Sequence, residues 1–547
     1  RYFSAFRAFL EESGLRARDG GPVASIYFAG LPEACELVRE RFPDVAGLFR
    51  GDESPLECLD ILGIPRRYFP AGLAAGAAYD EARLAFGREI VRSGTYRSVA
   101  PVDRSSSPRF GRRGDGIVSR IAHGSARGLP PLMRAHLGPY LPDRREAVEL
   151  FLEWARRLGR GGLLDVLSIG PSQLSQSRFG EDWAGLPDGG GVPLNSPEEY
   201  GRAWEAARPM LVRTYAGTKD VPALARMYEQ RIDIAWHALS LWWFCAIDGR
   251  GPNSVMRNLL EHEATLRYIA STGKPFEPNV PHHFAFRGGD DVSFVVSGYL
   301  AAKAAKAAGV RFLVLQVMLN TPKATWGIQD LAKARALLAL ARSLEEGSFK
   351  VYLQPRAGLD YFSPDGAKAK AQLAASTALM DDIEPRDPGS PQIVHVVSWC
   401  EASRLADPEA VEESVGIVRY ALSEYRARRE RGEVADMGAD AEVAARTEEL
   451  LSEARAILAA IESSIERPCS AAGLYEILAS GFFPLPGLAY LRDEFAEAAG
   501  QRTALMGGAV KAVGPDGRPI PALERAARAA EIARRRSDRR SHGASGR

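Results

Sequence analysis

The sequence predicts an α/β fold, namely a (β/α)8 barrel with a small N-terminal α/β region and a C-terminal helical and irregular extension. Two observations support this prediction. From Leu129 onward a short apolar run recurs eight times, usually with an amphipathic segment of helical length after it. The runs are apolar enough to be buried on both faces, which is typical of parallel strands covered by helices. An open, doubly wound sheet is the alternative, but no glycine-rich phosphate-binding fingerprint follows any of the runs.

The repeat divides residues 129–430 into strand and helix units. The predicted strands are Pro131 to Met133, Leu163 to Ile169, Met210 to Val212, Leu241 to Ile247, His282 to Phe286, Phe312 to Met318, Lys350 to Leu353 and Ile393 to Val397. The predicted helices are Arg144 to Leu158, Val221 to Ala238, Ser254 to Ala270, Val292 to Ala308, Asp330 to Leu344, Gly366 to Met380 and Pro408 to Arg428. Parallel strands bring the residues at their carboxyl ends to one rim, so those residues are the candidate site.

The remaining segments are predicted from their composition. Residues 1–100 are expected to form a small α/β region that looks like the later half of a doubly wound module, or else an extension that packs on the barrel. Residues 101–128 are rich in Ser, Arg, Gly and Pro, which predicts a linker or mobile loop. Residues 431–525 combine a long helix with an apolar, proline-broken segment, Leu474 to Leu491, that is expected to cover the barrel. Residues 526–547 predict a basic, disordered tail.

Charge and cysteine content narrow the class of protein. The chain has 547 residues, with 70 Lys and Arg against 69 Asp and Glu, so its overall charge gives no reason to expect nucleic acid or a membrane surface as partner. No apolar run reaches the roughly 20 residues that span a bilayer, and the first residues have no signal-peptide layout, so a cytoplasmic protein is expected. The five cysteines are odd in number and form no CxxC pair, which predicts reduced thiols and no metal site.

Charged residues follow several of the predicted strands. Arg134, Arg178 and Arg213 come after the first three strands, and Asp248 ends the fourth. Three guanidinium groups at one rim suit a dianionic ligand, because each can grip a carboxylate or phosphate through two parallel hydrogen bonds. The alternative for any one of these arginines is a structural salt bridge.

Other polar residues are weaker candidates. His282 and His283 are adjacent on one predicted strand, so their side chains would point to opposite faces and only one could line a site. Three residues at or near strand ends could reach a polar ligand: Gln316, Gln354 and Glu401.

Short motifs at these strand ends resemble the catalytic subunit of coenzyme-B12-dependent glutamate mutase, also called methylaspartate mutase. The segments that match the family's arginine claw are Met133-Arg134-Ala135, Ser177-Arg178-Phe179 and Val212-Arg213-Thr214. Further similar segments are Ile247 to Gly251, Phe276-Glu277-Pro278, Ser293 to Val310, Ile328 to Ala332, Leu353-Gln354, Cys400-Glu401-Ala402 and Gly487 to Pro521. The likeness covers about residues 129 to 525.

The resemblance implies a (β/α)8 barrel that converts glutamate to 3-methylaspartate, or rearranges a related amino diacid, by a radical reaction of adenosylcobalamin. It implies that Arg134, Arg178 and Arg213 hold the carboxylates of the substrate and that Asp248 pairs with its ammonium group. Glu401, Gln354 and Asn195 would contact the cofactor, Glu401 at the adenosyl ribose.

The family also has a small partner subunit whose Asp-x-His-x-x-Gly motif supplies the ligand of cobalt. None of the eight histidines here sits in such a motif, so the resemblance implies a hetero-oligomer with a cobalamin-binding subunit. The α/β character of residues 20–70 leaves open that the N-terminal region is a truncated module of that kind.

The sequence also departs from the family. Two tyrosines that hold the substrate fall at Ser254 and Asn258, a lysine near the adenosyl group falls at Val397, and a glutamate is replaced by Asp248. These changes leave the exact substrate open. They also keep two alternatives: a cobalamin-independent lyase or isomerase that binds an acid on the barrel, and a non-catalytic paralogue that binds a dicarboxylate or a cobalamin protein.

Overall fold

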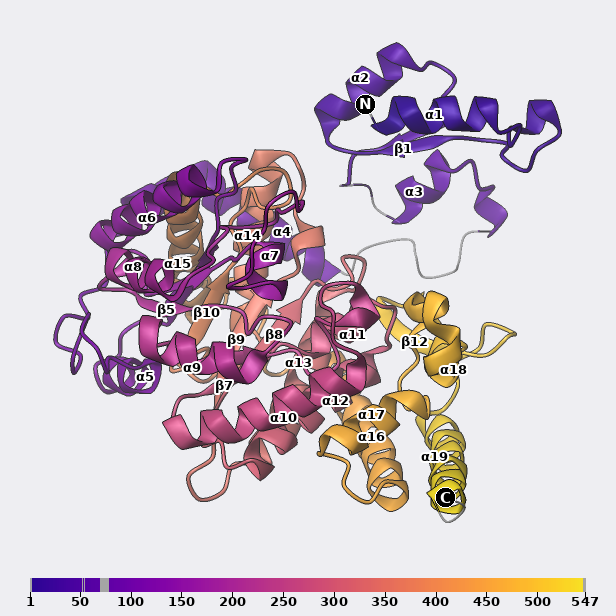
Figure 1. The fold of residues 1–547 in the computed structure, drawn as a ribbon. Helices are drawn as coiled ribbons and strands as arrows, with labels where there is room; N and C mark the ends of the chain where they lie inside the picture. The colour runs from indigo at the N-terminus through magenta and orange to yellow at the C-terminus, as the bar shows by residue number, and fades with distance from the viewer. Residues whose placement is uncertain (1, 52, 54, 69–77, 545–547) are drawn as a thin grey trace.

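The computed structural model describes residues 2–51, 53, 55–68 and 78–544. Its N-terminal part is a small α/β unit that stands apart from the rest of the chain in Figure 1. The unit contains α1 (Tyr2–Glu12), β1 (Tyr27–Ala29), α2 (Pro32–Arg41), β2 (Gly47–Phe49) and α3 (Pro55–Ile61). Its two strands pair in parallel. After residues 69–77, α4 (Ala78–Ser93) packs against the main body.

The main body contains eight parallel strands in two four-stranded sheets. The strands are β3 (Leu132–Leu137), β4 (Val166–Ile169), β5 (Leu211–Arg213), β6 (His237–Leu239), β7 (Phe276–Pro278), β8 (Phe312–Leu319), β9 (Lys350–Ala357) and β10 (Ile393–Val396). One sheet has the order β10-β3-β4-β5 and the other β6-β7-β8-β9, and every pairing is parallel. An α/β fold with parallel strands, as the sequence predicts, is confirmed.

Helices lie around the strands (Figure 1). They are α5 (Ile117–Ala126), α6 (Arg144–Gly161), α7 (Gln173–Ser177), α8 (Pro197–Ala207), α9 (Val221–Ile232), α10 (Val255–Thr272), α11 (Pro281–Ala285), α12 (Asp291–Ala307), α13 (Gly327–Arg342), α14 (Gly366–Asp381) and α15 (Pro408–Glu430). Many begin at a side chain that accepts a backbone N–H of the first turn, which satisfies one of the unpaired donors there. These capping residues are Asp143, Ser172, Ser196, Ser254, Asp290, Asp365 and Asp407.

The predicted strand Leu241 to Ile247 is wrong, and the true strand β6 lies a few residues earlier. Leu241 and Phe244 have φ angles of 50° and 63°, a left-handed backbone that no strand contains. The predicted helix from Val221 to Ala238 is also too long, because Asp233 turns left-handed and ends α9 at Ile232. The apolar residues run almost without interruption across both boundaries, so periodicity cannot locate them.

The predicted strand His282 to Phe286 is wrong as well. These residues belong largely to the short helix α11, which Pro281 begins at its first position. The strand is β7, Phe276–Pro278, where a central Glu277 breaks the apolar run on which the sequence argument relied.

Residues 101–128 do not form a linker or mobile loop. Helix α5 closes the amino-terminal end of the strands, where Ile117 and Ile121 join an apolar cluster with residues of both sheets. Two arginines of the segment are buried: Arg104 Nε donates to Asp165 at 2.7 Å, and Arg120 pairs with Asp115. Composition failed here because these charges are paired inside the fold.

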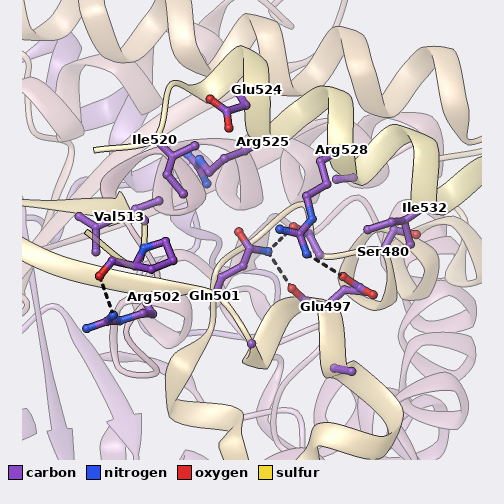
Figure 2. Close-up of a pocket in the computed structure, with 17 residues that line it drawn as sticks. Ser480, Glu497, Gln501, Arg502, Val513, Ile520, Glu524, Arg525, Arg528 and Ile532 are labelled. Atoms are coloured by element: carbon purple, nitrogen blue, oxygen red, sulfur yellow. Dashed lines mark hydrogen bonds and ion pairs between the residues drawn. The ribbon is translucent and has the colours of Figure 1, made fainter. Parts of the chain in front are cut away.

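The C-terminal extension packs beside the helices of the second sheet. It contains α16 (Ala441–Ser464), α17 (Ala471–Ala479), η6 (Pro486–Leu491), α18 (Arg492–Ala499), the hairpin β11 (Arg502–Met506) and β12 (Ala509–Val513), and α19 (Ala522–Ala544). A pocket of about 230 Å³ lies between α18, the hairpin and α19. Figure 2 shows the side chains that line it. At this pocket Gln501 donates to the carbonyls of Gly481 and Glu497, and Arg528 pairs with Glu497 at 3.6 Å. These contacts join parts of the extension to one another.

The disordered tail predicted for residues 526–547 is instead the packed helix α19 as far as the structure describes it; residues 545–547 lie outside the described range. One face of α19 is buried, and Arg525 pairs with Asp290 at 2.7 Å. The small alanines on that face allow close approach to α16, while Arg528, Arg534, Arg535 and Arg539 are exposed and contribute to the basic composition of the segment.

We expect Ala530→Glu to undock α19, because Ala530 is only 2% exposed and the substitution would bury an unpaired carboxylate, at about 1–3 kcal/mol. Ala527→Glu is the matched control, since Ala527 lies on the exposed face of the same helix. Limited trypsin digestion should cleave the C-terminal helix faster in the first variant only. Equal digestion of both variants would mean that the tail does not dock.

Candidate functional site

The side chains between the two sheets form layers, with apolar residues near the amino-terminal ends of the strands and polar residues further along them. Along each strand every second residue faces inward. The lowest inward residues form an apolar cluster together with α5: Leu132, Val166, Leu211, Trp236, Val314 and Ile393. Two residues further along the strands stand polar side chains: Arg134, Ser168, Arg213, Gln316 and His395, with Gln354 on β9. All six are at most 1% exposed, so the middle of this interior is polar and buried.

Glu277 joins the arginines of this layer. Its Oε2 accepts from Arg134 Nη1 at 2.7 Å and its Oε1 from Arg213 Nη2 at 3.1 Å. Trp236 Nε1 and Gln354 Nε2 also donate to Oε2, at 2.7 and 2.9 Å. The carboxylate on β7 therefore supplies the negative charge that offsets the repulsion between two buried arginines of the opposite sheet.

The electrostatics of the cluster favour its charged forms. Burial alone would raise the pKa of Glu277, but Arg134 and then Arg213 outweigh it and hold the pKa at about 2. Burial, followed by the nearby Arg213, lowers the pKa of Arg134 to about 9, which leaves its guanidinium charged at neutral pH. The pair of arginines and their carboxylate thus carry a net positive charge.

Arg213 keeps donors that nothing in the described part of the chain accepts. Its Nε and Nη1 are buried and have no hydrogen-bond partner there, while its guanidinium lies 5.2 Å from the ring of Tyr215. A buried guanidinium N–H without an acceptor costs free energy, so such atoms are rare unless a ligand completes them. Arg213 is therefore the residue of the site best placed to bind an anion.

A third arginine, Arg356, stands at the same mouth and was missed in the sequence. Its Nε donates to the carbonyl of Ala357, and no described residue accepts from its terminal amino groups. Burial lowers its pKa, and its charge acts on Arg213, Glu277 and Glu401. Alternation along β9 would have found it, because Arg356 follows Gln354 by two residues and faces the same side.

Arg178 does not join the other two arginines of the predicted claw. It ends the short helix α7, has a side chain 51% exposed and pairs with Glu181 at 3.3 Å. It lines a separate surface pocket of about 340 Å³, together with Lys219 and Arg250. The arginines that meet are Arg134, Arg213 and Arg356.

Asp248 is not placed to receive a substrate ammonium group. Its Oδ2 accepts from the backbone N–H of Phe244 at 3.0 Å and from Arg287 Nη2 at 2.9 Å, and its Oδ1 from the N–H of Cys245 at 3.1 Å. Its side chain is 4% exposed. These bonds hold the left-handed turn at Leu241 and Phe244, so the structure gives Asp248 a structural role.

We expect Asp248→Asn to lower the free energy of unfolding by about 1–3 kcal/mol, because it removes the charge opposite Arg287 and turns one acceptor into a donor facing an N–H. Urea unfolding measures this loss. Affinity for a carboxylic acid should change less than threefold in the same variant. A large loss of affinity with unchanged stability would instead mean that Asp248 binds the substrate.

The three residues expected to contact a cofactor are spread over the structure. Gln354 is fully buried, accepting from Arg134 and donating to Glu277. Both ends of the Asn195 amide are bonded locally, to Gly180 N and to the carbonyl of Glu181. Glu401 follows β10, accepts from Ser398 N at 2.7 Å and has a pKa raised by burial.

His282 and His283 lie on α11, both buried, with ring centroids 4.5 Å apart. Two other histidines, His136 and His395, face the interior from β3 and β10 and touch each other. The sequence argument overlooked both, because it ended the first strand at Met133 and regarded the last strand as apolar.

No protein-family model and no curated protein matches the chain. Among solved structures, it is similar to the spore coat polysaccharide biosynthesis protein spsE of Bacillus subtilis, with 11% identity and a TM-score of 0.33 over 58% of this chain and 73% of that one. It is also similar to the carboxyl transferase domain of Rhizobium etli pyruvate carboxylase, with 12% identity and a TM-score of 0.30 over 82% and 88% of the two chains. Similarity this low carries no inference about activity. Of the helices described, none is long and apolar enough to cross a bilayer.

Proposed function

We propose that this chain is the catalytic subunit of an adenosylcobalamin-dependent isomerase of the glutamate mutase type, which rearranges an amino diacid inside a closed (β/α)8 barrel. The observation that carries the proposal is that two guanidinium donors of Arg213, Nε and Nη1, are buried in a polar interior without a hydrogen-bond partner in the described part of the chain, with the charge of Arg356 nearby. Carboxylates are the groups that such donors bind best.

Closure of the barrel is supported at both junctions of the two sheets. Ala235, just before β6, donates its N–H to the carbonyl of Val212 on β5 at 2.8 Å. At the other junction β9 lies beside β10, and Leu353 N donates to the side chain of Gln392 at 2.8 Å. In a closed barrel the carboxyl ends of the strands are the usual position of the active site.

The charge of the interior favours a diacid over a monoacid. Arg134, Arg213 and Arg356 bring three guanidinium groups, and among the described residues Glu277 is the carboxylate that pairs with Arg134 and Arg213. The positive charges therefore outnumber the carboxylates paired with them, and an uncompensated charge away from water is costly. The next carboxyl group, Glu401, acts on Arg356, and burial raises the pKa of this carboxyl. A dianion would neutralise the site.

The residues of this chain fit adenosylcobalamin only in part. Glu401 stands at a strand end where it could accept a hydroxyl, whereas Gln354 and Asn195 have their amides fully engaged within the protein. The proposal therefore assigns the cofactor mainly to a partner subunit and assigns to this chain the binding and shielding of the acid. Arg213 and Arg356 would orient its carboxylates, and the apolar floor under Arg134 would exclude water from below.

The test has two stages. Calorimetry of the chain alone with L-glutamate and L-3-methylaspartate should show binding at the barrel mouth. Addition of adenosylcobalamin and a cobalamin-binding subunit of the glutamate mutase family should then give a cob(II)alamin signal that depends on the acid. If neither acid produces that signal or turnover, the mutase proposal fails.

The same experiment separates the alternatives. Turnover without cobalamin would point to an ordinary lyase or isomerase on the same acid site. Binding with no turnover in either stage would indicate a regulator, and the engagement of Glu277 by two arginines favours this second candidate, since an internal carboxylate already occupies part of the anion site.

A further inference from the structure

A chain of hydrogen bonds runs across the interior from the end of β7 to β3. It ends on a histidine ring nitrogen that has no hydrogen-bond partner in the described part of the chain. It passes from Asn279 through Gln316 and His395 to His136, whose Nε2 is buried without a hydrogen-bond partner in the described part of the chain. The direction of each bond follows from the groups that can only donate.

The amide of Gln316 is oriented by its neighbours. Its Oε1 lies 3.5 Å from Arg134 Nη1, which can only donate, and its Nε2 donates to Asn279 Oδ1 at 3.1 Å. His395 Nδ1 lies 3.2 Å from the same Oε1 and must therefore carry the proton.

The two histidines then follow in order. Burial, with Arg134 and Arg356 nearby, lowers the pKa of His395 well below its usual value, so the ring is neutral and its Nε2 is an acceptor. His136 Nδ1, 3.1 Å away, donates to it. Burial and the arginines likewise lower the pKa of His136, so its ring is neutral and its Nε2 presents a lone pair.

The ring of His136 lies near Arg213, whose donors the proposed acid would use. The rings of His136 and Tyr215 stack at 5.5 Å with an interplanar angle of 11°, and the guanidinium of Arg213 lies 5.2 Å from the centroid of the same Tyr215 ring. Within the described part of the chain, the site thus combines two buried donors of Arg213 and one buried acceptor of His136 that have no hydrogen-bond partner.

We infer that His136 Nε2 accepts a hydrogen bond from an N–H or O–H group on the acid whose carboxylate is held by Arg213 and Arg356. His136 is then a positioning residue that selects amino or hydroxy acids over unsubstituted ones. The inference rests on the proposed function, because it takes the acid at this mouth as given. The hydrogen-bond chain to Asn279 keeps His136 in the tautomer whose Nε2 is an acceptor. In the other tautomer, two donors or two acceptors would face each other at one link of the chain.

Calorimetry with three acids of equal length tests this: L-glutamate carries an ammonium group, L-2-hydroxyglutarate a hydroxyl, and glutarate neither. The wild-type chain should bind at least one of the first two about tenfold or more tightly than glutarate. His136→Asn keeps an amide at the Nδ1 position, next to His395, but lacks the acceptor. It should reduce the preference to less than about twofold, chiefly by weakening the acid that carries the donor.

His136→Gln, whose amide reaches the Nε2 position, should restore part of the preference. A loss of affinity that is equal for all three acids would mean that His136 only supports the fold and would overturn the inference. So would a wild-type chain that binds acids without preferring a donor. If none of the three acids binds, the proposed acid site itself fails.

Nitrogen NMR of the wild-type chain with isotope-labelled histidines tests the inference without comparing the affinities of variants. The His136→Gln variant is needed only to identify which signal belongs to His136. His136 Nε2 should show the shift of an unprotonated ring nitrogen, and L-glutamate or L-2-hydroxyglutarate, but not glutarate, should move it. A protonated Nε2 in the free protein would contradict the assigned tautomer.

Discussion

Glu277→Ala is expected to lower the free energy of unfolding by about 3–5 kcal/mol, the largest stability effect of any single substitution in the polar interior. The carboxylate accepts from Arg134, Arg213, Trp236 and Gln354. Its removal would leave two guanidinium groups buried without a counter-charge, and neither can lose its proton cheaply. Denaturant unfolding measures the effect.

Glu181→Ala is the matched control, since Glu181 pairs with Arg178 and Lys219 on the surface and such exposed pairs contribute about 0–1 kcal/mol. A loss of less than about 1 kcal/mol in Glu277→Ala would show that water or an ion replaces the carboxylate and that the interior is not closed.

The pH dependence of stability follows from the same residue. The pKa of Glu277 falls from an ordinary 4.5 to about 2 in the folded protein. A lowered carboxyl pKa contributes stability that is fully present above the unfolded value and is lost as the pH falls through the folded one. Between about pH 4.5 and 2 the wild-type chain should therefore lose more stability than Glu277→Ala does.

Arg213→Lys is expected to weaken binding of a diacid such as glutarate by at least about 100-fold, because two charge-assisted hydrogen bonds from Nε and Nη1 are lost and each contributes about 1.5–3 kcal/mol. Lysine keeps the charge that faces Glu277, so the fold should tolerate the change better than a neutral residue. Calorimetry gives the affinity, and urea unfolding of the same sample shows how much of the fold is retained.

Arg178→Lys is the matched control for Arg213→Lys. The resemblance to glutamate mutase would give Arg178 the same importance as Arg213, whereas the structure places it on the surface beside Glu181. We expect its diacid affinity to stay within about threefold of wild type. A loss comparable to that of Arg213→Lys would mean that the segment around α7 closes over the acid when it binds.

Most helices between residues 129 and 430 could be predicted from sequence because their signals are local. A capping side chain marks the start, as Asp143 does for α6 and Asp407 for α15, and the spacing of apolar residues marks the buried face. Six of the eight strands were also located, since their apolar runs are bounded by polar residues. The other two failed at β6 and β7, where the apolar run continues past the strand or a buried Glu277 interrupts it.

The site was predicted only in part, for a related reason. Arg134 and Arg213 follow or end apolar runs and stand out in the sequence. Arg356 and His136 were missed because the predicted strands stopped too early, although both follow an inward-facing polar residue by two positions.

By itself, the sequence determined the alternation of helices and parallel strands and two of the arginines that meet inside, because spacing and capping act between neighbours in the chain. Only the tertiary structure decided which charges meet. Glu277 reaches Arg134 across 143 residues, His136 reaches His395 across 259, and Arg178, nearer in sequence to the other arginines, stays outside. These contacts form a candidate site because the groups are buried. A polar group that is removed from water needs a hydrogen-bond partner in the protein or in a ligand.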